Sequence, residues 1–308
     1  MKFLITGGAG FIGSHLCDSL LNKGNEVIIL DNLTTGRQEN VSPKATFVFG
    51  EVTDSDLVYD LICKVDGCFH LAAIPSVEQG HQNWLGCNHV NLVGSLVIFD
   101  AVKKMQKKKI PVIYASSAAV YGNNPLLPLN ETSLLEPLSA YGVDKLSSEL
   151  HAKIATSIHG IPTIGLRFFN VFGPRQDPSS PYSGVISIFI ERFKANQHIN
   201  IYGDGEQTRD FIFVGDVVEG LIAAFNHKNK STAEIYNICT GFSTSINQLA
   251  REIAFLLKKN LKVIHEPPKP GDIRHSLGDP TKAHKILGFK AAYDLRQGLA
   301  QMLQNVVV

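Results

Sequence analysis

The sequence predicts an α/β protein in which a doubly wound parallel sheet is followed by a smaller α/β domain. Through the first half of the chain, short apolar runs alternate with longer amphipathic segments, a pattern typical of strands and helices in turn. The short runs are apolar throughout instead of alternating, as expected of parallel strands covered on both faces. A glycine-rich segment joins the first run to the first amphipathic segment. These three observations favour an open sheet with helices on both sides.

Each expected element follows from this pattern and from the residues that end it. We expect strands at Lys2–Thr6, Glu26–Leu30, Thr46–Phe49, Gly67–Leu71, Pro111–Ala115 and Pro162–Arg167. We expect helices at Phe11–Asn22, Asp54–Cys63, Asn83–Lys107 and Ala140–His159. Gly24 is placed to end the first helix and Gly160 to end the last, because glycine readily adopts the left-handed conformation that closes a helix.

Beyond Arg167 the chain changes to shorter elements, separated by loops rich in glycine, proline, aspartate and serine. Loops of this kind inside an ordered protein usually carry function. We therefore expect residues 1–168 to form the first domain and residues 169–308 a smaller domain that closes over the carboxyl edge of the sheet. The segments Asp210–Val214 and Glu234–Ile238 are expected to return to the first domain.

Composition excludes several classes of protein. The chain of 308 residues carries 29 Lys and Arg against 28 Asp and Glu, a net charge of +1, which argues against a nucleic-acid binder with a strongly basic face. No apolar run reaches the roughly 18 residues of a membrane span, so no membrane segment is expected. The five cysteines form no CxxC pair, and the histidines show no paired ligand spacing. We expect no metal, reduced thiols and a cytoplasmic location.

The glycine-rich segment, Thr6-Gly7-Gly8-Ala9-Gly10-Phe11-Ile12-Gly13, follows the first expected strand and opens the first helix. Glycines here allow a tight turn and bring a pyrophosphate close to the backbone and the helix N-terminus. Asp31 ends the second expected strand, where it can accept hydrogen bonds from the ribose hydroxyls and repel a 2′-phosphate. The segment therefore predicts a Rossmann dinucleotide site that favours NAD over NADP. The alternative is a tight turn without a ligand.

A second pattern points to proton transfer. Tyr141 is the one tyrosine with a lysine four residues later, Lys145, and on a helix these side chains share a face. Nearby positive charge favours the phenolate, so Tyr141 is a candidate base; the alternative is an exposed helix pair. Ser116 and Ser117 follow an expected strand, at the edge where open α/β sheets bind ligands, although two serines there could also be turn residues.

These motifs resemble the extended branch of the short-chain dehydrogenase/reductase superfamily and, within it, the nucleotide-sugar 4-epimerases. Beyond the glycine segment and the Tyr141/Lys145 pair, the resemblance depends on further motifs in the family's order. They are His70-Leu71-Ala72-Ala73, Ser116-Ser117-Ala118-Ala119-Val120-Tyr121-Gly122, Arg167-Phe168-Phe169-Asn170-Val171-Phe172-Gly173-Pro174 and Gly203-Asp204-Gly205-Glu206-Gln207-Thr208-Arg209-Asp210-Phe211-Ile212.

The resemblance implies C4 epimerisation of a UDP-hexose with bound NAD. Tyr141 would take the proton from the C4 hydroxyl, and Ser117 would hydrogen-bond O4. Lys145 would hold the nicotinamide ribose and lower the pKa of Tyr141. The resulting 4-keto sugar would turn within the site and take the hydride back on its other face.

The resemblance also implies a set of contacts. NAD contacts fall on Gly7, Gly10, Phe11, Ile12, Gly13, Asp31, Asn32, Gly36, Glu51, Val52, Leu71, Ala72, Ala73, Tyr141, Lys145 and Phe168. Contacts to the UDP-sugar fall on Ser76, Ser116, Ser117, Asn170, Val185, Tyr202, Arg209, Lys269, Asp272 and Ser276. Within these sets, Asn170, Arg209 and Lys269 would contact the phosphates. Glu51 departs from the family, which usually has an aspartate there near the adenine.

Three positions bear on the substrate. Ala118 and Ala119 replace the acidic residue of family dehydratases, and the glutamate typical of decarboxylases in this stretch is also absent. Ser276 stands where a side chain limits the room for the C2 substituent, and a small residue leaves space for an N-acetyl group. We therefore favour interconversion of UDP-N-acetylglucosamine and UDP-N-acetylgalactosamine, with UDP-glucose and UDP-galactose as a second pair. A different NDP-sugar epimerase or reductase, such as a UDP-uronic acid 4-epimerase, and a non-catalytic NAD-binding regulator stay open.

The resemblance also implies an assembly. Family members usually pack two long helices from each subunit into a four-helix bundle. The expected helices Asn83–Lys107 and Ala140–His159 are long enough for this, so we expect a homodimer.

Overall fold

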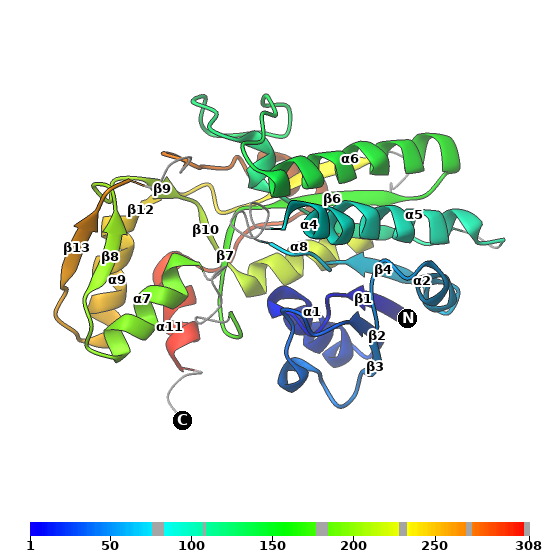
Figure 1. Cartoon of the computed structure of the whole chain (residues 1–308), viewed down its shortest axis with the longest axis horizontal. Coiled ribbons are helices and arrows are strands. Elements are labelled where there is room, and N and C mark those ends of the chain that lie inside the picture. Colours follow the sequence, from blue (N-terminus) through cyan, green and yellow to red (C-terminus); the bar gives the residue numbers. More distant parts are fainter. Residues whose placement is uncertain (76–82, 107–108, 177–183, 228–232, 269–272, 305–308) are drawn as a thin grey trace.

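The structure, a computed structural model, is built on a parallel sheet of seven strands with helices on both faces (Figure 1). It describes residues 1–75, 83–106, 109–176, 184–227, 233–268 and 273–304. The strands lie in the order β11-β6-β5-β4-β1-β2-β3. Their bounds are β1 Lys2–Thr6, β2 Glu26–Asp31, β3 Thr46–Phe49, β4 Gly67–His70, β5 Val112–Ser117, β6 Thr163–Phe168 and β11 Glu234–Ile238. The predicted fold class is confirmed.

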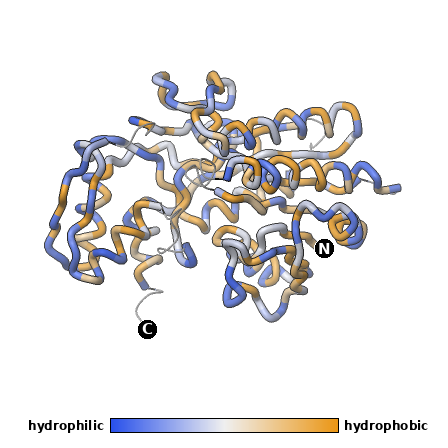
Figure 2. Tube along the Cα trace, viewed as in Figure 1, coloured by the Kyte–Doolittle hydropathy of each residue, from blue (hydrophilic) through white to orange (hydrophobic). Residues whose placement is uncertain are grey.

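Alternate residues of each strand enter different layers of the core, which explains the uniformly apolar strands. In β1, Phe3 and Ile5 join one buried cluster, whereas Leu4 joins another on the opposite face. The first cluster lies under α1 (Phe11–Asn22) and α8 (Val214–Asn226). The second lies under α2 (Ser55–Ile62), α5 (Gly94–Lys104) and α6 (Ala140–His159). Figure 2 shows hydrophobic and hydrophilic segments along these helices, as expected of helices with one buried side.

The strand order reverses at β1, and this reversal places the site. β2 pairs with one edge of β1 and β4 pairs with the other, so Thr6 lies between Leu30 and His70. Chain connections leave in opposite directions from two such strands, and a crevice opens at their carboxyl ends.

The helix predicted over Asn83–Lys107 forms in three pieces. α4 (Trp84–Asn88) continues into a π-helical turn (His89–Val93) and then into α5. By length and a mean hydropathy of 1.4, Trp84–Lys104 could cross a membrane. α5 nevertheless packs between α2 and α6, as a core helix does.

The second lobe, at the left of Figure 1, has its own core. Its helices are α7 (Val185–Lys194), α9 (Ile246–Leu257) and α11 (Leu295–Gln304), whereas α10 (Thr281–Leu287) packs on α8 and β11 of the first lobe. Its strands form two-stranded pairs: β7 (Asn170–Phe172) with β10 (Phe211–Phe213), β8 (Ile199–Tyr202) with β13 (Val263–Glu266), and β9 (Thr208–Arg209) with β12 (Thr244–Ser245).

Of the two segments expected to return to the first domain, one joins its sheet. Glu234–Ile238 becomes the edge strand β11 beside β6. Asp210–Val214 contains β10, which pairs with β7 outside the central sheet, although Ile212 belongs to the core cluster of the first lobe. α8, which starts directly after β10, carries the chain back to the first lobe, where it packs on α1.

Candidate active site

A cleft of about 420 Å³ opens at the carboxyl edge of the sheet. Among the residues expected to hold NAD, those that line it are Gly7, Gly10, Phe11, Ile12, Gly13, Asp31, Asn32, Glu51, Val52, Leu71, Ala72, Ala73, Tyr141, Lys145 and Phe168. Gly36 lies behind the described lining, where a Cβ atom would come within 2.9 Å of Asp31 Oδ1.

Close packing explains the glycines of the first loop. Gly7 has a φ of +72°, and a Cβ atom there would lie 2.7 Å from the backbone nitrogen of Ala72. A Cβ atom on Gly13 would lie 2.2 Å from the carbonyl oxygen of Gly7. Gly10 caps the N-terminus of α1 without a side chain, so the first backbone N–H groups of that helix face the cleft region unobstructed. This arrangement fits a pyrophosphate group.

The end of β2 supplies the acidic part of the cleft. Asp31 is buried, and its two oxygens accept hydrogen bonds from the backbone N–H groups of Ala9 (2.9 Å) and Leu33 (2.8 Å). Burial raises its pKa, and these two hydrogen bonds oppose that rise. Asn32 donates to both carboxylate oxygens of Glu51, at 3.1 and 3.0 Å. The acidic groups are therefore held in place and fit the hydroxyl groups of an adenosine ribose.

The predicted proton-transfer residues meet at the opposite end of the cleft. Tyr141 lies in the first turn of α6. Ser139 caps the N-terminus of this helix, because its hydroxyl accepts a hydrogen bond from Gly142 N–H at 3.1 Å. The Ser117 hydroxyl at the end of β5 lies near the Tyr141 phenol and lowers its pKa. Lys145, one turn further along α6, donates to the carbonyl oxygen of Ala115 at 3.0 Å. All three side chains line the cleft.

Burial dominates the pKa values of both Tyr141 and Lys145. Burial raises the pKa of Tyr141 to about 12, and the nearby Ser117 hydroxyl offsets part of this rise. The Lys145 ammonium lies 5.7 Å from the centre of the Tyr141 ring. Burial lowers the pKa of Lys145 itself to about 8.

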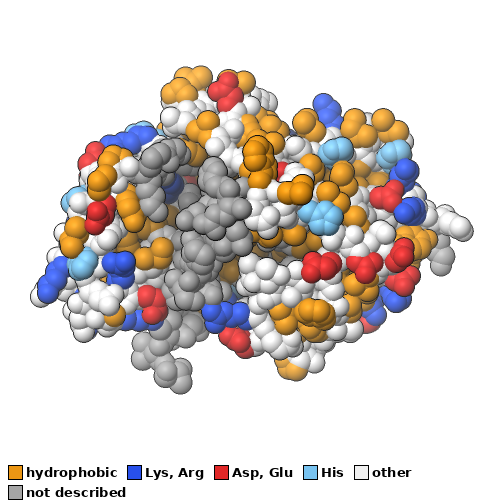
Figure 3. Space-filling view, viewed as in Figure 1, with side chains coloured by type: hydrophobic (Ala, Val, Ile, Leu, Met, Phe, Trp, Pro, Cys, Tyr) orange, Lys and Arg blue, Asp and Glu red, His pale blue; other side chains and the backbone are white. Residues whose placement is uncertain are grey.

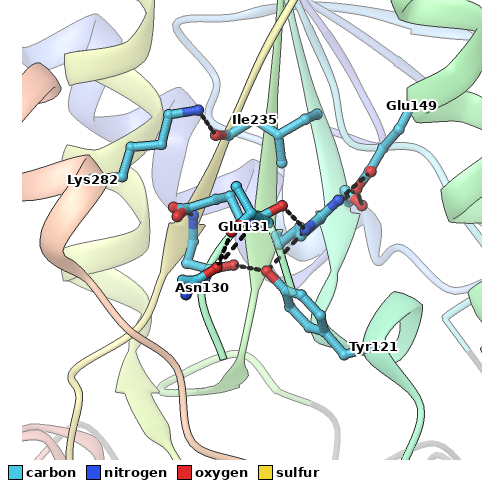
Figure 4. A network of polar contacts seen from close by, with 10 residues as sticks. Tyr121, Asn130, Glu131, Glu149, Ile235 and Lys282 are labelled. Carbon is cyan, nitrogen blue, oxygen red and sulfur yellow. Dashed lines mark hydrogen bonds and ion pairs between the residues drawn. The ribbon is translucent and has the colours of Figure 1, made fainter. Parts of the chain in front are cut away.

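Ser116 lines the cleft, but its hydroxyl donates into a buried polar network that the sequence analysis missed. Figure 4 shows part of this network, around Glu149 and Tyr121. Ser116 donates to Glu149 on α6, whose carboxylate is paired through two bonds, of 2.9 and 2.7 Å, with Arg167 on β6. Arg167 also donates to the Tyr121 hydroxyl at 2.9 Å, and this hydroxyl donates to Asn237 on β11 at 2.7 Å. An arginine inside an apolar strand is the one sequence signal for such a network, since a buried charge needs a partner.

The residues expected to contact the sugar nucleotide are more dispersed. Asn170 lines the cleft, and Val185 begins α7 directly after Gly184, which also lines it. Ser276 is buried, its backbone N–H donates to Thr208, and it does not belong to the described cleft lining. Ser76, Lys269 and Asp272 lie outside the described residues.

Tyr202 and Arg209 lie on the second lobe. Tyr202 lines a separate open hollow together with Gln207 and Arg274. Arg209 is half-buried, and its guanidinium donates to the carbonyl oxygen of Thr208 at 2.9 Å. Further residues line the cleft that were not predicted as contacts. Phe169 and Val171 belong to the quoted motif around Asn170, whereas no motif was a signal for Thr34, Thr35, Gly50, Ile74, Pro75, Val90 and Gln176.

Comparison with known proteins identifies the family. Residues 3–239 match the model of the NAD dependent epimerase/dehydratase family. A putative UDP-glucose 4-epimerase of Methanocaldococcus jannaschii is 40% identical over 301 residues, which cover 97% of this chain and 96% of that protein.

Solved structures agree. UDP-glucose 4-epimerase of Thermotoga maritima with UDP-glucose superposes with a TM-score of 0.95 at 35% identity, covering 99% of this chain and 98% of the other. UDP-N-acetylglucosamine 4-epimerase of Methanobrevibacter ruminantium, in complex with UDP-N-acetylmuramic acid, gives a TM-score of 0.93 at 37% identity with the same coverage.

A decarboxylase is also among the relatives. The UDP-N-acetyl-alpha-D-glucosaminuronate decarboxylase of Bacillus cytotoxicus is 33% identical over 317 residues, covering 98% of this chain and 97% of that protein. Overall similarity therefore defines the family more sharply than the reaction. A nucleotide cleft with fixed glycines, a buried Asp31 and a paired Tyr141 and Ser117 agrees with these matches. The chain belongs to the NAD dependent epimerase/dehydratase family, and its cofactor is NAD.

Proposed function

We propose that this enzyme interconverts UDP-hexoses that differ at C4, with UDP-N-acetylglucosamine and UDP-N-acetylgalactosamine as the preferred pair. The observation that carries the proposal is that Tyr141, Ser117 and Lys145 line one cleft together with the glycine loop, with the Ser117 hydroxyl near enough to lower the pKa of Tyr141. A dehydrogenation at C4 needs a base and a group that orients O4, and this pair supplies both.

The residues would move one proton out and back. The Tyr141 phenolate takes the proton of the C4 hydroxyl, while Ser117 hydrogen-bonds O4. Bound NAD supplies the hydride acceptor and later the hydride donor. Once the 4-keto sugar has turned to present the other face of C4 to the cofactor, Tyr141 would return the proton to O4 as the carbonyl is reduced, so the reaction has no net redox change. Lys145, with a pKa of about 8, is mostly charged at neutral pH and stabilises the phenolate and the cofactor ribose.

The two lobes would divide the ligands between them. We assign NAD to residues 1–168 together with the returning strand β11, and the UDP-sugar largely to residues 169–308. Asn170, Arg209 and Lys269 would meet the phosphates, because a diphosphate needs hydrogen-bond donors and cations. Asp272 would accept hydrogen bonds from the uridine ribose, and Ser76, Ser116 and Val185 would contact the sugar side of the site.

The hollow around Tyr202 suits the base. Tyr202 presents an exposed aromatic side chain, and Gln207 Oε1 is buried without a hydrogen-bond partner among the described residues. Uracil has both a face that can stack and an N3–H group that can donate to such an oxygen. We place the uracil ring there.

The preference for an acetylated sugar is supported by the small size of Ser276 and by the likeness to a UDP-N-acetylglucosamine 4-epimerase. The purified enzyme can be incubated separately with UDP-N-acetylglucosamine, UDP-glucose and UDP-glucuronic acid, and the products separated by chromatography. We expect UDP-N-acetylglucosamine to be converted to its C4 epimer most rapidly. Faster conversion of UDP-glucuronic acid would contradict the proposed substrate. Release of carbon dioxide would show that the enzyme is a decarboxylase instead of an epimerase. Turnover by Tyr141→Phe equal to that of the parent would contradict the proposed mechanism.

A substitution tests the specificity position. Ser276→Tyr is expected to slow UDP-N-acetylglucosamine at least tenfold while UDP-glucose is largely retained, since a buried tyrosine would occupy the space of the acetyl group (order of magnitude for overpacking). Ser276→Ala is the matched control and keeps both activities. Unchanged turnover of the acetylated sugar by Ser276→Tyr would contradict the role of this position.

We also propose a homodimer in the cytosol. α6 exposes Val143, Leu150, Ile154 and Ile158 at spacings that form one stripe. Trp84 at the start of α4 is also exposed, and α4 packs beside α6. Figure 3 shows hydrophobic side chains gathered over this part of the surface. Two copies of the surface would form a four-helix bundle, and the five unpaired cysteines suit a reducing compartment.

A further inference from the structure

A buried chain of hydrogen bonds lies behind one wall of the cleft. We call residues Leu71–Pro75, all of which line the cleft, the 71–75 wall. Two hydrogen-bonding groups hold this wall from behind. Ala72 N–H donates to Thr6 Oγ1 at 3.2 Å. Further along, Asn91 Oδ1 accepts from Ile74 N–H at 2.8 Å, and Asn91 Nδ2 donates back to Ile74 O at 3.3 Å.

The two anchors are joined to each other through His70. Its Nδ1 lies 2.8 Å from Thr6 Oγ1, and its Nε2 lies 3.0 Å from Ser95 Oγ. Ser95 Oγ in turn donates to the carbonyl oxygen of Asn91 at 2.9 Å. Thr6, His70, Ser95 and Asn91 are all buried, at most 2% exposed. The wall, β1, β4 and the π-helical turn therefore form one closed hydrogen-bonded ring.

The donors and acceptors of this ring fix one tautomer. Ser95 uses its single proton on Asn91 O, so it must accept from His70, which places a proton on Nε2. Nδ1 is then an acceptor and receives the Thr6 hydroxyl proton, while Thr6 Oγ1 accepts from Ala72 N–H. If the proton were on Nδ1, this nitrogen could no longer accept the hydrogen bond from the Thr6 hydroxyl. Burial and the nearby Lys145 charge also lower the pKa of His70, to about 3.

We propose that His70, as the neutral Nε2–H tautomer, is a positioning residue that holds the 71–75 wall in place and thereby sets the affinity for NAD. The proposal rests on the proposed contact of Leu71–Ala73 with the cofactor. The wall has little freedom to adjust, since a Cβ atom at Gly7 would already touch the Ala72 backbone at 2.7 Å. Ser148 on α6 lies 3.2 Å from Ser95 Oγ and three residues beyond Lys145, so the ring also adjoins the catalytic helix.

Thr6 allows a matched test. Thr6→Val keeps the shape but removes both the donor to His70 and the acceptor for Ala72, and we expect its Kd for NAD to rise about tenfold in calorimetric titration. Thr6→Ser keeps the hydroxyl and should stay within about threefold of the parent. Thr156→Val is the control, because Thr156 is also buried and hydrogen-bonded, to Ile161 O and Thr163, but lies at the far end of α6.

Thr156→Val should lose thermal stability without a change in NAD affinity. Parental NAD affinity in Thr6→Val, or an equal rise of Kd in Thr156→Val, would overturn the proposal.

The tautomer is tested without any ligand. ¹⁵N NMR of the full-length protein, with the His70 signals assigned by comparison with His70→Gln, should show the neutral Nε2–H form throughout pH 5 to 8. Titration of His70 in this range, or the Nδ1–H form, would overturn the proposal. Neither experiment contains a sugar nucleotide, so failure of every UDP-sugar to turn over would remove the proposed reaction and leave this inference standing.

Discussion

Lys145 brings an ammonium group into the interior, where 3% of the residue is exposed. Burial lowers its pKa from 10.5 to about 8, while in the unfolded chain the group keeps the higher value. The unfolded chain therefore binds this proton more tightly, so the contribution of Lys145 to stability rises as the pH goes from 8 to 10.5. At neutral pH, the buried positive charge of Lys145, which the proposed reaction uses, therefore lowers the stability of the folded protein.

Replacement of this charge should separate stability from activity. Lys145→Met keeps the aliphatic part of the side chain, and we expect it to raise the free energy of unfolding at pH 7 by about 1–3 kcal/mol while turnover is lost. Urea unfolding at pH 7 and pH 10 measures the effect, which should shrink at the higher pH. A variant less stable than the parent at pH 7 would contradict the cost assigned to the buried ammonium.

The position of Ser117 beside Tyr141 predicts a pH dependence. Because the Ser117 hydroxyl lowers the pKa of Tyr141, Ser117→Ala should move the rising limb of the kcat profile to higher pH. At neutral pH its kcat should fall about 10²-fold, as expected when a group that assists proton transfer is removed. Ser117→Thr, which keeps a hydroxyl, is the control. A limb that moves to lower pH in Ser117→Ala would contradict this role.

At the scale of elements, the sequence predicts α1 and α6 to the residue, because each has a continuous amphipathic pattern closed by a glycine. It does not predict the π-helical turn at His89–Val93, since one inserted residue hardly alters the periodicity. The glycine loop and the Tyr141/Lys145 pair are predictable because their spacing is local. The partners of Arg167 are not, since they come from distant parts of the chain and meet only in the fold.

The Glu149–Arg167 pair joins α6 to β6 in the buried interior, and each charge depends on the other. Glu149→Gln is expected to cost about 3–5 kcal/mol in urea unfolding, because it leaves the Arg167 charge buried and uncompensated. The double variant Glu149→Leu/Arg167→Met should recover much of that loss. Ser116→Ala, which removes a single donor to Glu149, should cost about 1 kcal/mol. Equal losses in Glu149→Gln and the double variant would show that packing, rather than charge, dominates here.

For the whole molecule, the exposed stripe of α6 predicts the oligomeric state. Ile154→Glu places a charge in the centre of the proposed four-helix bundle and should convert a dimer into a monomer in size-exclusion chromatography with light scattering. Phe242→Glu is the control, because Phe242 is 77% exposed but lies in the loop between β11 and β12, away from α6. A parent protein that is monomeric at micromolar concentration would contradict the dimer.

The position of β11 at the edge of the central sheet has a consequence for biosynthesis. β6 finds its last neighbour only in residues 234–238, after the chain has passed through much of the other lobe. During translation, the outer edge of β6 therefore stays unpaired while the intervening segment emerges from the ribosome. Pairings so far apart in sequence form slowly. The sheet of the first lobe is thus completed only after much of the second lobe has been made. A fragment that ends between the two lobes would leave the edge of β6 unpaired and prone to aggregate.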